Sequence, residues 1–341
     1  MARICVVSFR LGGTDGVSIE AAKWINALSS LGHSITTVAG EGDADVILPG
    51  LAINADSPPT SSELKNVFTD VDLVIVENLC SLPLNIPARD ALYEALSNKK
   101  ALFHHHDLPW QRAHLAHLSG PLDAPDWHHV TINDLSRREL QSRGITATTI
   151  MNSFDCNPPL GEREKTRTAI NIGSETLVLL PTRAIPRKNI EGALQLCESL
   201  NAVLWILGPT EDGYDNELAG LLAASNVEIR RGVPAGVSIH DAYAACDVVV
   251  MPSTWEGFGN PVIESVTHRR PLCVYPYPVL SEIESHGFEF FDLDEVNELR
   301  EFLGNPDEDF YERNLNVAGQ YFNLGDLANR LAKLLSGMEI T

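Results

Sequence analysis

The sequence has few basic residues for its size. Its 341 residues include 25 lysines and arginines against 46 aspartates and glutamates, a formal net charge of −21. Both halves of the chain are net negative, and basic residues gather only in doublets such as Lys99-Lys100 and Arg269-Arg270. Proteins that bind nucleic acid or anionic membranes need a concentrated basic surface. We therefore expect no nucleic-acid partner and no strong membrane association.

Long apolar runs are also missing. The longest have the length of a strand, such as TLVLLP, and fall far short of the roughly 20 residues that span a bilayer. Met1 is followed almost at once by a predicted strand, ICVVSF, rather than by the pattern of a signal peptide. The six cysteines are dispersed without a CxxC pair, and several fall in predicted strands or helices. We expect a protein of the reducing cytoplasm.

What the sequence does contain is a regular alternation of predicted strands and helices, in two series. This pattern is typical of doubly wound parallel sheets, and the chain is too long for one ordinary core. The segment NSFDCNPPLGE, with two prolines and a glycine, resembles a linker between the series. We expect an α/β protein with two Rossmann-like domains, residues 1–155 and 156–310, and a helical C-terminal segment, 311–341.

The most informative segment is MPSTWEGFGNPVIES, residues 251–265. A predicted buried strand ends there and a helix begins, with Asn260 expected at the cap and Pro261 at the first helical position. Gly257 and Gly259 allow a ligand to approach the backbone. Free amides and the positive end of a helix favour an anion or sugar hydroxyl groups at such a turn.

Two carboxylates, Glu256 and Glu264, lie on either side of this turn. Together with the glycines they indicate a site for a nucleotide sugar. The alternative is that the glycines only make a tight connection and that Glu264 only complements the helix dipole.

At these residues the chain resembles the retaining family 4 glycosyltransferases, which have the GT-B fold. EGFGNPVIE is similar to the family's pattern of two glutamates separated by seven residues. Further segments match in the family's order, namely RLGGTDGVS, the HD of FHHHD, IMNSFD and PTRAIPRKN. The resemblance spans nearly the whole chain, with 251–265 and 181–189 as its specific parts. It implies that the C-terminal helices, 311–341, cross back onto the first domain, and the apolar spacing of Leu327, Leu331 and Leu335 suits that docking.

The resemblance assigns a role to the cations of PTRAIPRKN. In the family, the positions of Arg183 and Lys188 hold the leaving nucleoside diphosphate. Charge grows on the departing phosphate toward the transition state, and fixed cations stabilise it without reorganisation. Arg187 is an additional cation to which the sequence assigns no role. The alternative for the whole segment is a surface loop with solvated charges.

The same resemblance implies the donor-binding groups. Glu264 is expected to accept hydrogen bonds from the ribose, and Glu256 to bind sugar hydroxyl groups near the anomeric carbon. In the family, backbone amides of the turn complete this pocket, and here they belong to Gly257, Phe258 and Gly259. The family more often has a hydrophobic residue where Asn260 stands, so the identity of the donor stays open.

A glycine pair follows the first predicted strand in RLGGTDG. Its spacing lacks the full G-x-G-x-x-G pattern, which disfavours a dinucleotide site. The resemblance implies that this loop lies near the donor phosphate and the acceptor, and assigns that role to Gly12, Gly13 and Asp15. An ordinary turn between a strand and a helix is the alternative.

Three consecutive histidines end another predicted strand. Because side chains alternate along a strand, His104, His105 and His106 are not all expected to face one site. His106-Asp107 matches the family's HD pair, and the resemblance implies that His106 contacts the donor sugar or lies beside the reacting centre. A core histidine bonded to the backbone is the alternative, and the roles of His104 and His105 stay open.

No metal site is expected. His114 and His117 lie three residues apart on a predicted helix, but no carboxylate or cysteine accompanies them at a ligand spacing. Two Asp-x-Asp segments, at 43–45 and 292–294, have the form of the metal-binding motif of the other glycosyltransferase fold. Neither follows a convincing nucleotide-binding pattern.

These observations predict a metal-independent, retaining glycosyltransferase. It is expected to move a hexosyl unit from a nucleotide diphosphate sugar, its co-substrate, to a hydroxyl group of a small or soluble acceptor, without a further cofactor. Retention is implied by the family alone. The alternatives are a GT-B sugar-nucleotide epimerase, a phosphorylase-like enzyme or, from a different class, a noncatalytic sugar-nucleotide-binding protein. The nucleotide base, the sugar, the acceptor and the oligomeric state stay open.

Overall fold

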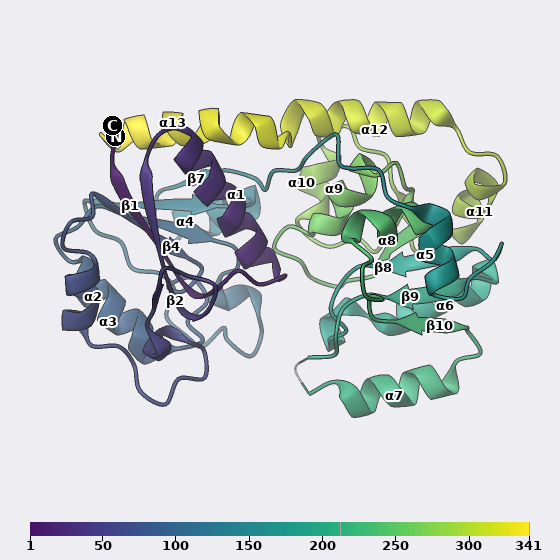
Figure 1. Cartoon of the computed structure of the whole chain (residues 1–341), viewed down its shortest axis with the longest axis horizontal. Coiled ribbons are helices and arrows are strands. Elements are labelled where there is room, and N and C mark those ends of the chain that lie inside the picture. The colour runs from purple at the N-terminus through teal and green to yellow at the C-terminus, as the bar shows by residue number, and fades with distance from the viewer. Residues whose placement is uncertain (212, 341) are drawn as a thin grey trace. The chain divides into compact units, whose positions relative to one another are not determined.

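The computed structural model describes residues 1–211 and 213–340. The chain folds into two compact units. The first unit consists of Met1–Ser153 together with the chain from Leu324 onward, and the second is Phe154–Asn323. Each unit is built on one parallel sheet with helices packed against it (Figure 1).

The sheet of the first unit has the strand order β3-β2-β1-β4-β5-β6-β7, and all neighbouring strands are parallel. Its strands are β1 (Arg3–Leu11), β2 (Ser34–Gly42), β3 (Val46–Ile47), β4 (Leu73–Glu77), β5 (Ala101–His105), β6 (Trp127–Thr131) and β7 (Ala147–Thr149). The order reverses between β1 and β4. At such a reversal the loops diverge to opposite faces and leave a crevice at the carboxyl ends of the strands, where ligands of doubly wound proteins bind.

Helices cover both faces of this sheet. They are α1 (Gly16–Ser30), α2 (Ser61–Val67), α3 (Ile86–Leu96), α4 (Asp134–Gln141) and α13 (Leu327–Gly337). Successive side chains of β1 point to opposite faces. Val7 therefore packs in the core beneath α2 and α3, whereas Val6 packs with Trp24 of α1 and Leu331 of α13. Figure 1 shows α1 and α13 on the same side of the sheet.

The sheet of the second unit has the order β10-β9-β8-β11-β12-β13, also parallel throughout. Its strands are β8 (Leu177–Leu180), β9 (Val203–Ile206), β10 (Ile229–Arg231), β11 (Val248–Met251), β12 (Leu272–Val274) and β13 (Phe291–Asp292). The order reverses between β8 and β11. Its helices are α5 (Arg163–Ala169), α6 (Ile190–Leu200), α7 (Asp215–Ala224), α8 (Ile239–Ala245), α9 (Asn260–Thr267), α10 (Leu280–Glu284), α11 (Val296–Gly304) and α12 (Glu308–Tyr321).

The predicted C-terminal segment, 311–341, is divided between the two units. Helix α12 belongs to the second unit, and only from Leu324 onward does the chain belong to the first. The reason is aromatic burial, because Phe310 packs on Phe291, and Phe322 packs on Phe288 within the second unit. The segment was expected to pack as a whole on the first domain, and that expectation is wrong for α12.

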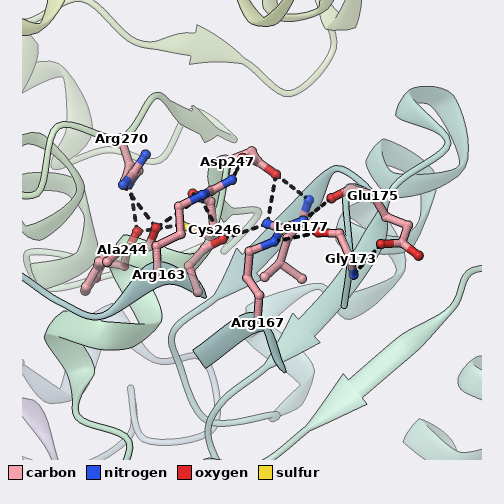
Figure 2. A network of polar contacts seen from close by, with 11 residues as sticks. Arg163, Arg167, Gly173, Glu175, Leu177, Ala244, Cys246, Asp247 and Arg270 are labelled. Carbon is pink, nitrogen blue, oxygen red and sulfur yellow. Dashed lines mark hydrogen bonds and ion pairs between the residues drawn. The ribbon is translucent and has the colours of Figure 1, made fainter. Parts of the chain in front are cut away.

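Three arginines bind the carboxyl end of α8 in the second unit, two from α5 and one from the segment between α9 and β12. Arg163, Arg167 and Arg270 all donate to carbonyl groups of residues 243–246, and Arg163 and Arg167 also bond Asp247 (Figure 2). The last carbonyl groups of a helix have no partner within it and carry partial negative charge. The guanidinium groups satisfy them.

In the part of the chain that the structure describes, no helix is both long enough and apolar enough to cross a membrane.

Candidate functional site

Two loops of the second unit meet at the point where its strand order reverses. One follows β8 and leads through a short 3-10 turn, Pro186–Lys188, to α6, and the other follows β11 and leads to α9. Because β8 and β11 are parallel neighbours, their carboxyl ends lie at the same edge of the sheet. The expected donor-binding residues of both loops are therefore brought together.

Lys188 and Glu256 form an ion pair across these loops. The Lys188 Nζ lies 2.5 Å from Oε1 of Glu256, and Arg187 Nη1 donates to Oε2 of the same carboxylate at 2.9 Å. Lys188 and Glu256 are both buried. Arg187 also donates to the carbonyl group of Trp255. Arg187, to which the sequence assigned no role, thus shares the Glu256 carboxylate with Lys188.

The charges of this cluster stabilise one another. Burial by itself raises the pKa of Glu256, but Lys188 and Arg187 outweigh burial and lower that pKa to about 2. Burial lowers the pKa of Lys188, and Glu256 opposes this effect. A buried charge is tolerated only when it is paired and hydrogen-bonded, which both groups are.

Arg183 has a different partner. Its Nη1 lies 2.5 Å from Oε2 of Glu211, and both side chains are about one-third exposed (35%). Arg183 is still close enough to Lys188 to contribute to the lowering of the lysine's pKa. The cluster thus contains three cations, Arg183, Arg187 and Lys188, opposed by two carboxylates.

The turn before α9 is shaped by Gly259. This residue has φ +90° and caps the helix, while Asn260 is already the first helical residue. A Cβ atom at position 259 would lie 2.4 Å from Cε of Met251 and 2.5 Å from the hydroxyl group of Tyr277. The expectation that Asn260 is the cap is therefore wrong, because the left-handed backbone and the close packing both select glycine at the preceding position.

Phe258 is buried, and Tyr277 donates to its carbonyl group at 2.7 Å. Its ring packs on Phe154 and Phe322 in the core of the second unit. The side chain of Phe258 therefore contributes to stability, which leaves the backbone amide as the group available for the expected role in ligand binding.

Glu264 lies in α9 and is half-buried. Its Oε2 accepts a hydrogen bond from the Tyr243 hydroxyl group at 2.7 Å. Burial, and next the Glu264 charge, raise the pKa of Tyr243 well above its ordinary value, so the phenol stays a donor. Nothing in the sequence pattern singled out Tyr243, since its contact with Glu264 depends on how α8 packs near α9.

In the first unit, the glycine loop is closely packed against neighbouring segments. Gly12 has φ +74°, and a Cβ atom there would lie 2.6 Å from Cβ of Asp43. Asp15 caps α1 by accepting from the backbone N–H groups of Val17 and Ser18, and it also bonds Arg10 at 3.0 Å. These contacts give Gly12 and Asp15 structural roles.

The exposed Gly13 lies beside them in the same loop. The expected role of Gly12, Gly13 and Asp15 in phosphate and acceptor binding stays a prediction.

The ends of β4 and β5 carry a buried cluster of one carboxylate and two imidazoles. The Oε2 atom of Glu77 accepts from His104 Nδ1 at 2.9 Å and from His106 Nε2 at 3.0 Å. His105 points to the opposite face, where it bonds Ser81 and His129. The strand alternation expected for the three histidines is confirmed.

Glu77 and His106 favour the ionised form of each other. Burial by itself raises the pKa of Glu77, but the two histidines outweigh burial and lower that pKa to about 2. Burial also disfavours a charged His106, yet its hydrogen bond to Glu77 and the charge of Glu77 raise its pKa. Sequence reasoning missed Glu77, although its position at the carboxyl end of the predicted strand DLVIVE was a usable signal.

In the described residues, the group with a spacing compatible with a metal ion is Glu77 with His104 and His106, whose candidate atoms all lie within 4.8 Å of one another. Both imidazoles already have a hydrogen-bond partner in Glu77. Within the described part of the chain, the pair His114 and His117 and the segments 43–45 and 292–294 belong to no such group.

Two cavities lie away from these clusters. One of about 600 Å³, in the second unit, is lined by the arginines of Figure 2, and the other, of about 520 Å³ in the first unit, is lined by Trp127, His128 and Thr146. Both lie near the amino ends of strands, opposite to the edge where doubly wound folds bind ligands. The arginines already donate to carbonyl groups and Asp247, so they have a structural role.

Comparison with known proteins decides the class. Residues 162–301 match the family described as glycosyl transferases group 1. The mannosylglucosylglycerate synthase of Thermotoga maritima is 25% identical over 97% of this chain and 99% of its own length. The enzyme of the same name from Petrotoga mobilis is 25% identical over 85% of this chain and 86% of its own.

Solved structures agree in fold over almost the whole chain. Anabaena HepE in complex with UDP-glucose has a TM-score of 0.73 at 17% identity, and covers 99% of this chain and 100% of its own. Sucrose-phosphate synthase from Thermosynechococcus elongatus has a TM-score of 0.76 at 15% identity, with 99% of both chains covered. The chain has the GT-B fold and is similar in sequence to glycosyltransferases. The fold and the general class expected of it are thereby confirmed.

Proposed function

We propose that this GT-B glycosyltransferase is a family 4 enzyme that transfers a hexosyl unit with retention from a nucleotide diphosphate sugar to a hydroxyl group of a small or soluble acceptor. The observation that carries the proposal is the cluster of Arg183, Arg187 and Lys188 at the edge where β8 and β11 end. A diphosphate needs several fixed positive charges, and this cluster supplies them close to the start of α9.

Donor binding is expected to replace some of the contacts that the carboxylates make with the cations. Its diphosphate would take the place of Glu211 on Arg183 and add to the partners of Lys188. Glu256, held by Lys188 and Arg187, would keep one face for the sugar hydroxyl groups. Glu264, held by Tyr243, would accept from the ribose.

Catalysis by these residues would be electrostatic. Cations placed beside the leaving phosphate stabilise the charge that develops as the glycosidic bond breaks. In a front-side reaction the leaving phosphate accepts the proton of the attacking hydroxyl group, so no second carboxylate nucleophile is needed. The same cations would replace the divalent ion of metal-dependent transferases, and we propose that the enzyme needs no metal.

The similar proteins support the choice of substrates. HepE binds UDP-glucose, and the curated relatives are named as synthases of mannosylglucosylglycerate, a small glycoside. We propose a sugar nucleotide as donor and a small hydroxyl compound as acceptor. We further propose the cytoplasm as the compartment, which the dispersed cysteines without a CxxC pair support.

The first test is a thermal-shift panel of UDP-, GDP- and ADP-sugars, because a ligand that binds only the folded state raises its melting temperature. Candidate acceptors are then added to the best donor, and nucleoside diphosphate release and the anomeric configuration of the product are measured. Release that depends on the acceptor, with a retained anomer and no loss in EDTA, is the expected result. Interconversion of sugars without acceptor would favour an epimerase, and binding without turnover a sensor. Strict dependence on Mg²⁺ or Mn²⁺ would overturn the metal-independent proposal.

A further inference from the structure

Glu77 is a fully buried carboxylate that contacts histidines of the FHHHD motif. An unpaired charge in such a place is strongly destabilising, so its partners must be specific. The partners are His104 and His106, which lie 27 and 29 residues further along the chain. The reaction described above gives Glu77 no role, and general stability alone does not require an ionised group there.

The contact with Glu77 determines which atom of His106 is available. Because Nε2 is bonded to Glu77, Nδ1 is the remaining nitrogen of the ring, and among the described residues no partner is found for it. The backbone is held as firmly, since the N–H groups of His106 and Asp107 both donate to Oδ1 of Asn78, at 3.1 and 3.2 Å. Ring and backbone of His106 are thus both tied to the end of β4.

The Glu77 carboxylate is itself fixed by His104. His104 donates from Nδ1 to the Glu77 carboxylate, and its ring stacks on Trp24 of α1 with the centroids 4.1 Å apart. The chain of contacts therefore runs from Trp24 through His104 and Glu77 to His106. Such a chain restricts the rotation of the carboxylate, and through it the orientation of the imidazole.

The surrounding charges favour a doubly protonated ring. Glu77 on β4, Glu20 on α1 and the adjacent Asp107 all favour the imidazolium form of His106, and burial opposes it. The like charge of a protonated His104 would also oppose it. Glu77 hydrogen-bonds the ring, and the sum of these effects raises the pKa of His106.

We propose that Glu77 is a positioning residue, which holds His106 by Nε2 so that its Nδ1–H is the hydrogen-bond donor offered to an oxygen of the donor sugar. The inference rests on the proposed function and on the contact between His106 and the donor sugar that the resemblance to the family implies. It also assigns a direction to the contact. His106 then donates a hydrogen bond and does not act as a base, in agreement with a reaction in which the leaving phosphate takes the proton.

The decisive variant is Glu77→Gln, which keeps the shape of the side chain and removes its charge. Turnover at saturating donor should fall on the order of 10–100-fold, the loss seen when orienting partners of ligand histidines are removed. Affinity for the free nucleoside diphosphate should stay unchanged, since that ligand has no sugar. The ¹⁵N NMR signals of His106 should show both nitrogens protonated at neutral pH in the wild type and a neutral ring in the variant.

Ser81→Ala is the matched control. Ser81 is buried and bonds His105 on the opposite face of β5, so its loss should change the melting temperature without changing turnover or the His106 signals. Glu77→Asp serves if Glu77→Gln does not fold, because it keeps the charge but withdraws the carboxylate by one methylene group. It should lower turnover and leave nucleotide affinity intact.

Wild-type turnover together with unchanged His106 signals, in whichever of the two variants folds, would overturn the proposal. So would a shift of the His104 and His106 signals by added Zn²⁺ together with faster transfer, which would make the cluster a metal site. If the wild type transfers no sugar at all, the proposed function fails, whereas the NMR comparison still decides whether Glu77 orients His106.

Discussion

Lys188 and Glu256 form a buried ion pair although they come from loops 68 residues apart. The relative exposure of the two residues is 6% and 7%. The Arg183–Glu211 pair of the same cluster has side chains that are 35% exposed. Replacing the buried Lys188 should therefore lower both stability and activity, whereas replacing the partly exposed Arg183 should lower activity alone.

Arg183→Ala should reduce turnover on the order of a hundredfold, because one charge-assisted contact to the leaving diphosphate is lost. The melting temperature should hardly change, since a partly exposed pair contributes at most about 1 kcal/mol. Glu211→Gln is the control, and it should bind free nucleoside diphosphate at least as well as the wild type because a competing carboxylate is neutralised. Near-native turnover of Arg183→Ala would remove this residue from the site.

Lys188→Met should both inactivate and destabilise the protein. Removal of one partner of a buried pair leaves an uncompensated charge and costs about 3–5 kcal/mol. The double variant Lys188→Met with Glu256→Leu should regain much of that stability and stay inactive, which denaturant unfolding and transfer assays would measure in parallel. If the double variant is no more stable than the single one, the buried pair is not the source of the loss.

Glu264→Ala should weaken the binding of free nucleoside diphosphate, because the ribose loses its acceptor. Tyr243→Phe should weaken this binding less, since the substitution removes only the hydrogen bond that orients Glu264. Calorimetric titration of the two variants and the wild type measures this order. Equal affinity in Glu264→Ala and the wild type would exclude the ribose contact.

Acid should destabilise the first unit through His105 and His129. Burial lowers the pKa of both, so each is neutral in the folded state and takes up a proton on unfolding below about pH 6.5. Their contribution to stability is therefore complete above pH 6.5 and is lost as the pH falls toward their lowered folded-state pKa values. The raised pKa of His106 acts with the opposite sign, giving stability that is lost as the pH rises through that value.

His33, His268 and His286 also have lowered pKa values, so the histidines that destabilise the fold in acid outnumber His106, and the melting temperature should fall between pH 7 and pH 5.5. His129→Asn should flatten this dependence, which differential scanning calorimetry would measure. A melting temperature that rises toward pH 5.5 in the wild type would contradict the neutral state of the two buried imidazoles.

Arg167→Met should destabilise the second unit by about 3 kcal/mol or more, because Asp247 and several carbonyl groups lose a buried donor. Affinity for nucleoside diphosphate should stay unchanged in the folded variant, since the network lies near the amino ends of the strands. Arg313→Ala, in an exposed pair with Glu289, is the control and should have little effect. A loss of nucleotide affinity without a loss of stability would instead make the arginine cavity a binding site.

The amino-acid sequence was sufficient to predict the two parallel-sheet series and the loops that would bear functional groups. Alternating strands and helices specify parallel sheets, and parallel strands place their carboxyl ends at one edge. This position after strands and at a helix start indicated the loops of Arg183, Lys188, Glu256 and Glu264, and the resemblance to the family selected the two cations. The alternation of His104, His105 and His106 followed from the period of a strand in the same way.

Which of these side chains contact one another depends on how the elements pack in three dimensions. The pairing of Glu77 with His106 depends on the register of β4 and β5, and that of Arg187 and Lys188 with Glu256 on the proximity of β8 and β11. The selection of Gly259 as the cap of α9 depends on Met251 and Tyr277 packing against it. Local patterns carry none of this information, because distances between elements are set when the sheets assemble and the whole core packs.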